Sequence, residues 1–185
     1  MPLPIPIQTT LPALDALFAP WREALGEDYA AYRNHVCRLL HFCEALAPAP
    51  LSEEDRRRLM IAGVYHDLGI WSDGTVDYLP PSRTRAEQHL QAEGRGAWIE
   101  EVGLMIDEHH RLRRARAPAY PLVEVFRQAD LIDVSLGLIR FGLPRETVRA
   151  VRRAFPNAGF HRRLMRLAGV WFRAHPLSPP PFLKW

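Results

Sequence analysis

The sequence is poor in cysteine and almost without lysine. Its two cysteines, Cys37 and Cys43, are six positions apart, and Lys184 is the single lysine among 24 basic residues. Side chains six positions apart on one helix point in different directions, so these cysteines could not easily form a disulfide. A disulfide-stabilised secreted scaffold is therefore excluded, and a reducing cytoplasm is the expected compartment.

Long apolar runs are also missing. No stretch of eighteen apolar residues occurs, so we expect no membrane span. The first ten residues, MPLPIPIQTT, contain neither a basic segment nor a long apolar one, and no secretory signal is expected. Strand-like alternation and internal repeats are absent as well, which points away from β-rich and repeat architectures.

What the chain does have is the size and balance of a globular domain, with an uneven distribution of charge. It has 185 residues, 48% of them hydrophobic and 24% charged, which is enough for a real core. Residues 1–110 carry 9 basic and 17 acidic side chains, whereas residues 111–185 carry 15 and 4. The basic part could meet phosphate, nucleic acid or anionic lipid, or it could be a solvated surface that balances the acidic part.

Helical periodicity punctuated by proline and glycine predicts an all-α protein. Ser52 is expected to cap a helix that ends at Gly69, residues 70–81 to form a loop, and Ser82 to cap the next helix. On the helix expected over 28–47, one apolar face would be formed by Tyr32, Val36, Leu39, Cys43 and Leu46. The other expected helices cover 11–18, 97–110, 121–135 and 158–174, with one more opened by Pro144.

Several histidines and aspartates fall where helical spacing predicts an inward face. They are His35, His66, Asp67, His89, His109, His110 and Asp130. A lone histidine on such a face is usually a packed core residue, but several imidazoles and carboxylates aimed into one core are costly to bury unless something satisfies them. A divalent cation does so, because neutral imidazole and carboxylate are its ligands. The adjacent His66 and Asp67 could hold one ion together, or Asp67 could bridge two.

The order of these residues resembles the HD-domain superfamily of metal-dependent phosphohydrolases. The pattern H…HD…D is met by His35, His66–Asp67 and Asp130, and the phrases NHVCR, HDLGIW and ADLIDVS are similar to those of a bacterial HD-domain group of unassigned substrate. The resemblance implies an HD-domain helical bundle with extra C-terminal helices. The resemblance covers about residues 28–140, which we expect to form the metal-binding core of one domain over 1–185. A basic helical extension at about 141–175 and a proline-rich tail at 176–185 would follow this core.

The resemblance further implies one or two divalent transition metal ions, with iron or manganese favoured. The first ion would be held by His35, His66, Asp67 and Asp130. The second would be held by Asp67, His89 and His109, with His110 as a replacement for His109 or a neighbour of the ligands. Asp133 is expected to cap a helix or to pair with an arginine.

The implied activity is hydrolysis of a small phosphate ester or nucleotide by a metal-activated hydroxide. His66 and Asp67 would be central to catalysis, and Arg83, Arg111 and Tyr78 are candidates for binding the substrate. The cyclic-di-GMP-cleaving branch is disfavoured, because the residues after His110 do not continue to its Gly-Tyr-Pro motif. Nucleic acid is not the expected partner.

Two alternatives remain open. Some two-metal HD-domain proteins are di-iron oxygenases that cleave C–C or C–P bonds, and a phosphonate or polyol substrate on the same ligands would need both His89 and His109. The other alternative is a non-catalytic metal-containing signalling or binding module. The sequence also leaves open whether the protein forms a homo-oligomer.

Overall fold

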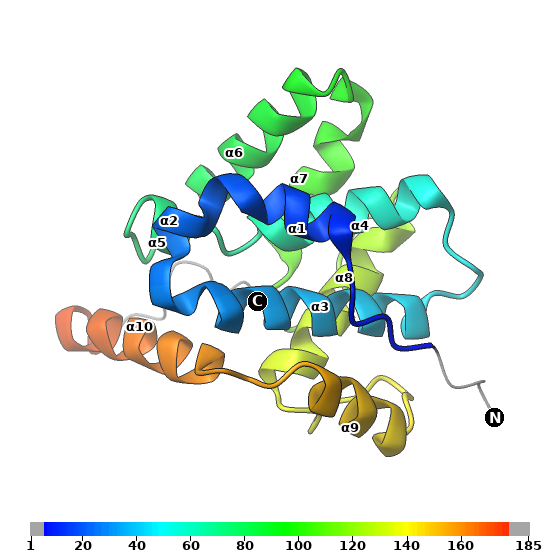
Figure 1. Cartoon of the computed structure of the whole chain (residues 1–185). Helices are drawn as coiled ribbons and strands as arrows, with labels where there is room; N and C mark the ends of the chain where they lie inside the picture. Colours follow the sequence, from blue (N-terminus) through cyan, green and yellow to red (C-terminus); the bar gives the residue numbers. More distant parts are fainter. Residues whose placement is uncertain (1–5, 178–185) are drawn as a thin grey trace.

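The computed structural model describes residues 6–177, and within that range it is built of helices without any strand. The predicted all-α fold is therefore confirmed (Figure 1). The helices are α1 Pro12–Phe18, α2 Arg22–Leu25, α3 Tyr29–Leu46, α4 Glu53–Tyr65, α5 Gly69–Ser72, α6 Leu79–Ala92, α7 Ile99–Glu108, α8 Pro121–Val134, α9 Arg145–Ala154 and α10 Phe160–Ala174. Short 3₁₀ turns lie at Ala19–Trp21, Gly26–Asp28 and Gly96–Trp98.

Helix α3 runs through the middle of the molecule. It packs most extensively against α8, and it also contacts α4, α9 and the start of α10. Figure 1 shows α1 and α2 along one side of α3, and α9 and α10 along the other. Tyr32, Val36, Leu39 and Cys43 of its predicted apolar face are fully buried, and so are residues on its other sides, including Ala31 and Cys37. A helix surrounded in this way is a suitable position for polar groups that must be kept from water.

Helix α4 begins as the sequence predicts. The Ser52 hydroxyl accepts a hydrogen bond from the Asp55 amide at 3.1 Å, and the Asp55 carboxylate accepts one from the Ser52 amide at 3.2 Å. This reciprocal pair satisfies two amides at the helix start, and an N-cap of this kind stabilises a helix by about 1 kcal/mol.

The end of α4 differs from the prediction. The helix ends at Tyr65, and Gly69 begins the short helix α5 inside the stretch expected to be a loop. Position 69 requires a glycine, because the Cβ of any other residue would lie 2.5 Å from the Tyr78 carbonyl oxygen. Ser82 is likewise no N-cap: α6 already begins at Leu79, and the buried Ser82 hydroxyl accepts a hydrogen bond from the Gly69 amide at 2.9 Å. Proline is tolerated in the first turn of a helix, which lets α6 begin before Pro80 and Pro81.

The remaining predicted helices agree with the structure to within one or two residues at most ends. Pro121 is the first residue of α8 and Pro144 is the N-cap of α9. None of the described helices is long and apolar enough to cross a bilayer. The proline-rich tail predicted over 176–185 lies largely outside the described residues, and the assignment of 1–185 to one domain stays a prediction.

The close contact at Gly69 gives a test of packing. Replacing Gly69 with alanine should lower the free energy of unfolding by about 1–3 kcal/mol, because the new methyl group meets backbone that cannot move away easily. Gly96→Ala is the control, since a Cβ at Gly96 has nothing within 4 Å and should change the stability by about 0.5 kcal/mol or less. Denaturant unfolding measures both values, and an equal effect of the two changes would contradict the structure.

The two cysteines give a second test. Both thiols are free and buried, and burial raises the pKa of Cys37 to about 11, while the pKa of Cys43 also rises well above its usual value. Because only the thiolate reacts, the folded protein at about pH 8 should react with a thiol reagent very slowly. Unfolding should release two rapidly reacting thiols per chain, and rapid labelling of the folded protein would show that one of the cysteines is exposed.

Candidate metal centre

The buried polar residues predicted from the sequence meet where four helices approach one another. His35 lies in the middle of α3 and Asp130 on α8, His66 and Asp67 follow the last residue of α4, and His109 follows α7. All five are almost completely buried. Tertiary packing thus brings together side chains that are as many as 95 residues apart in the chain.

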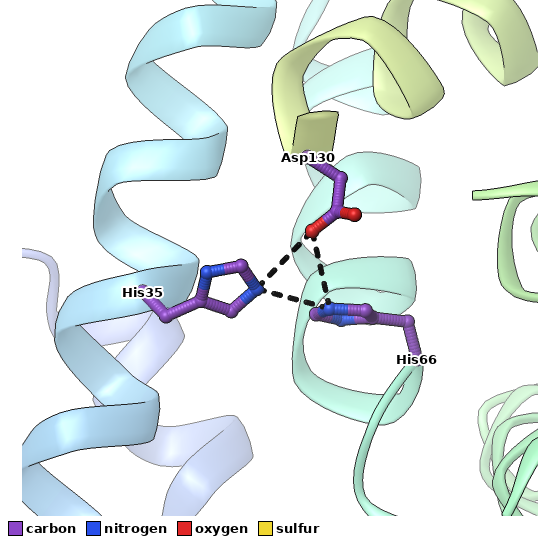
Figure 2. Close-up of side chains that lie close together, drawn as sticks. All are labelled: His35, His66 and Asp130. Carbon is purple, nitrogen blue, oxygen red and sulfur yellow. Dashed lines mark hydrogen bonds and ion pairs between the residues drawn. The ribbon is translucent and has the colours of Figure 1, made fainter. Parts of the chain in front are cut away.

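His35, His66 and Asp130 form one triangle of potential ligands, which Figure 2 shows. The His35 Nε2 atom lies 3.1 Å from His66 Nε2 and 3.4 Å from Asp130 Oδ1. His66 Nε2 lies 3.9 Å from the same Asp130 oxygen. Nitrogen and oxygen ligands that bind one ion at about 2.0–2.2 Å lie at separations of this size from one another.

A second group shares His66 with the first. Asp67 places Oδ2 3.3 Å from His66 Nε2 and Oδ1 3.4 Å from His109 Nε2. These three residues again offer ligand atoms within reach of one ion. His109, His110 and Asp130 form a third such group, and His110 Nε2 lies 4.0 Å from Asp67 Oδ1. The arrangement therefore has donors for one ion or for two that share ligands.

Hydrogen bonds on the far side of three imidazoles determine which nitrogen faces the cluster. The Nδ1–H groups of His66 and His109 donate to the carbonyl oxygens of Gly63 and Ile106 at 2.8 and 2.7 Å. His35 donates its Nδ1–H to the Asp133 carboxylate at 2.7 Å. In the neutral rings Nε2 then carries no proton, so three lone pairs point into the same buried volume.

The potential ligands around this volume are imidazoles and carboxylates, with no lysine or arginine among them. In the neutral rings, the Nε2 atoms of His35 and His66 face each other at 3.1 Å with no proton between them. The buried atoms Asp67 Oδ1 and His109 Nε2 have no hydrogen-bond partner within the described chain. Buried polar atoms of this kind are rare unless a ligand satisfies them. A divalent cation would satisfy all of them at once, so the donor set fits a metal.

The pKa shifts in the cluster indicate the same demand for positive charge. Burial alone would lower the pKa of His66, but Asp67 and Asp130 outweigh it, so that the net shift is upward. Burial would raise the pKa of Asp67, yet His66 and His109 hold it well below its usual value. The site thus favours a carboxylate next to a positively charged group.

A layer of buried contacts holds the ligands in place. Asp133 accepts the His35 Nδ1–H and also a bidentate pair of hydrogen bonds from Arg38, at 2.5 and 2.7 Å. Burial would raise the pKa of Asp133, but His35 and Arg38 outweigh it and keep the residue a carboxylate. The Phe160 ring stacks on His35 at 4.0 Å between centroids.

The expected pairing of Asp133 with an arginine is confirmed, but its contact with His35 was not predicted. Asp133 follows Asp130 by three positions, which places both carboxylates on one face of α8. That spacing was the signal available in the sequence.

His89 belongs to none of the three groups of potential ligands, so the described residues give its predicted role as a ligand no support. Its ring packs near Tyr65, with a centroid separation of 5.4 Å, and its Nε2 lies 3.3 Å from Glu93. The buried face of α6 is formed by Ser82, Ala86 and Leu90. His89 precedes Leu90, so its side chain is turned by about 100° to the edge of that face.

The three predicted substrate-binding residues have different surroundings. Tyr78 is buried beside the cluster, where its hydroxyl lies 2.5 Å from His110 Nε2. Arg83 is bound to Glu87 and Asp107, and Arg111 to Glu108 at 2.7 Å. Both guanidinium groups are thus already paired, and their contact with a substrate stays a prediction.

Comparison with known proteins agrees with this geometry. The chain matches the HD domain family over residues 32–135, which is more than half of its length, and it belongs to that family. The match spans His35, His66, Asp67, His109 and Asp130. Searches among curated proteins and among solved structures gave no significant match.

The buried Asp133–Arg38 pair can be tested by a double-mutant cycle. Asp133→Ala and Arg38→Ala should each lower the free energy of unfolding by about 3–5 kcal/mol, because each leaves a buried charge without its partner. The double variant should lose less than the sum of the two. The partly exposed ion pair between Arg85 and Asp73 is the control. Arg85→Ala breaks this pair and should lower the free energy of unfolding by about 1 kcal/mol or less. Additive losses at Arg38 and Asp133 would contradict a direct pair.

Proposed function

We propose that the protein is a metal-dependent phosphohydrolase that acts on a small phosphate ester or nucleotide. The observation that carries this proposal is the convergence of the Nε2 atoms of His35, His66 and His109 with the carboxylates of Asp67 and Asp130 in one buried volume. Membership in the HD domain family supports it, because metal-dependent hydrolysis is typical of that family.

The donor set agrees with one or two divalent transition metal ions, and iron or manganese is our preferred assignment. Imidazole suits these metals, and carboxylates add the hard oxygen ligands that Mn²⁺ accepts well. When bound, the metal would polarise the phosphoryl oxygens and lower the pKa of a water molecule enough to supply the attacking hydroxide.

The protein's own contribution is to fix the ligands before substrate arrives. The acceptors Gly63, Ile106 and Asp133 hold the three rings with Nε2 toward the cluster, so that no imidazole must rotate to bind an ion. The Tyr32 hydroxyl accepts a hydrogen bond from the Asp67 amide at 3.2 Å and donates one to the Val64 carbonyl at 2.9 Å. These contacts position Asp67 between His66 and His109.

His110 and Tyr78 lie at the edge of the cluster where a substrate could approach. The His110 side chain is 13% exposed, unlike the fully buried imidazoles of His66 and His109. Burial and the neighbouring His109 lower the pKa of His110 well below its usual value, so near pH 7 the ring is neutral. We propose that His110 and Tyr78 move a proton or contact the substrate rather than bind the primary ion.

We do not favour the di-iron oxygenase alternative, because it depended on His89 as a ligand of the second ion. That residue lies beside Tyr65 and Glu93. His110 offers a different donor beside His109 and Asp130, so two ions remain compatible with the cluster.

Metal content and hydrolysis test the proposal together. Protein purified without added metal should contain about one to two equivalents of transition metal, and a His66→Ala, Asp67→Ala variant almost none. Hydrolysis of bis(p-nitrophenyl) phosphate and of a nucleotide panel should fall at least about 100-fold in that variant, since the metal supplies the charge stabilisation.

A matched comparison uses His89 and His109, which were both predicted from the sequence to bind the second ion. His109→Ala should lose metal and activity, whereas His89→Ala should keep both within about twofold, because only His109 faces the cluster. Equal losses from the two changes would contradict the ligand assignment. Metal-loaded protein that releases no phosphate but consumes oxygen with an organic substrate would contradict the hydrolase.

A further inference from the structure

A second concentration of polar groups lies at α9, away from the metal cluster. The loop between α8 and α9 and one side of α9 line a hollow of about 410 Å³ that is open to solvent. In Figure 1, α9 lies on the opposite side of α3 from the α6–α7 hairpin. The hollow is lined by five arginines, which are Arg140, Arg145, Arg149, Arg152 and Arg153.

Helical spacing explains why four of these arginines share one side of α9. Arg149 follows Arg145 by four positions, and Arg152 and Arg153 follow by seven and eight. Residues with these separations project from the same face of a helix. The buried Val148 and Val151 anchor α9 to the rest of the protein, and Val148 also lines the hollow beside the arginines.

These guanidinium groups lack acidic partners. In the described part of the chain, none of the five forms an ion pair or a hydrogen bond with a carboxylate, and no acidic residue lines the hollow. Several arginines elsewhere do have such partners, as Arg33 has Asp15 at 2.5 Å and Arg58 has Asp55 at 2.7 Å. Five of the 15 basic residues after residue 110 therefore line one hollow without an acidic residue among them.

The helix itself gains nothing from this arrangement. Arg145 and Arg149, and again Arg149 and Arg153, are like charges four positions apart, which repel each other on a helix surface. Arg145 is also the first residue of α9, where the helix dipole disfavours a cation. A bound anion would offset the repulsion between the arginines and would itself interact favourably with the start of the helix.

We propose that this hollow binds a soluble polyphosphate anion, of which a nucleoside triphosphate is one form. Guanidinium groups bind phosphate oxygens through paired charge-assisted hydrogen bonds, and several of them around one hollow suit a ligand with several charges. The volume is within the range of small-molecule sites. Leu136, Leu138 and Val148 add an apolar wall that could contact a nucleoside.

The shape of the site favours a small ligand over an extended one. The row of arginines is limited to the ten residues of α9, and Arg140 of the preceding loop lines the same hollow, whereas a nucleic acid backbone or a bilayer would be contacted along a longer stripe. The site shares no residue with the metal cluster, so the proposal does not depend on the hydrolase assignment.

Titration calorimetry with inorganic tripolyphosphate and with ATP, at about 150 mM salt, tests the proposal. Arg149→Gln together with Arg152→Gln should weaken tripolyphosphate binding at least about tenfold, because two phosphate contacts are lost. The control is Arg162→Gln together with Arg166→Gln on α10, which removes the same charge from outside the hollow and should leave the affinity within about twofold. Thermal unfolding of each variant checks that it is folded.

Each outcome decides the matter. Tighter binding of ATP than of tripolyphosphate would extend the site to the nucleoside, and equal binding would restrict it to the phosphates; both support the proposal. Equal losses in the α9 and α10 variants would show only a general basic surface and overturn it. So would the loss of binding in the His66→Ala, Asp67→Ala variant, the absence of binding, or binding confined to duplex DNA or phosphatidylserine vesicles.

Discussion

In their neutral tautomers, His35 and His66 bring two Nε2 atoms without protons within 3.1 Å of each other in a buried cluster. Two lone pairs at this distance repel, and the carboxylates of Asp67 and Asp130 add negative charge beside them. Burial of such a set is unfavourable unless a positive group occupies the space between the atoms. The positions of α3, α4, α7 and α8 have to satisfy this requirement as well as the packing of their apolar faces.

The contacts behind the ligands link the cluster to the helices that follow the HD domain match. Asp133 joins His35 to Arg38, and Arg38 donates to the carbonyl oxygen of Phe155 just after α9 at 3.0 Å. Phe160, the first residue of α10, stacks on His35. The basic C-terminal helices therefore help to hold the proposed ligand His35 in place, and α9 also lines the arginine hollow.

Much of this arrangement could be predicted from the sequence, because helices depend on local periodicity and the order of the histidines and aspartates resembles the HD-domain pattern. The positions of His35 and Asp130 on two helices, and of His66 and Asp67 next to a third, agree with that expectation. His89 could not be excluded in advance, since a rotation of one residue on α6 decides whether a side chain faces the cluster. Gly69 and Ser82 look like helix-end signals in isolation, yet their close contact across α5 and α6 depends on tertiary packing.

Anomalous diffraction from crystals of the protein grown with Mn²⁺ or Fe²⁺ tests the central claim most directly. We predict a strong peak within about 2.0–2.4 Å of the Nε2 atoms of His35 and His66 and of a carboxylate oxygen of Asp130. A second peak bound by Asp67 and His109 would indicate two ions. An empty cluster under these conditions, with His35 and His66 joined by a proton alone, would contradict the account.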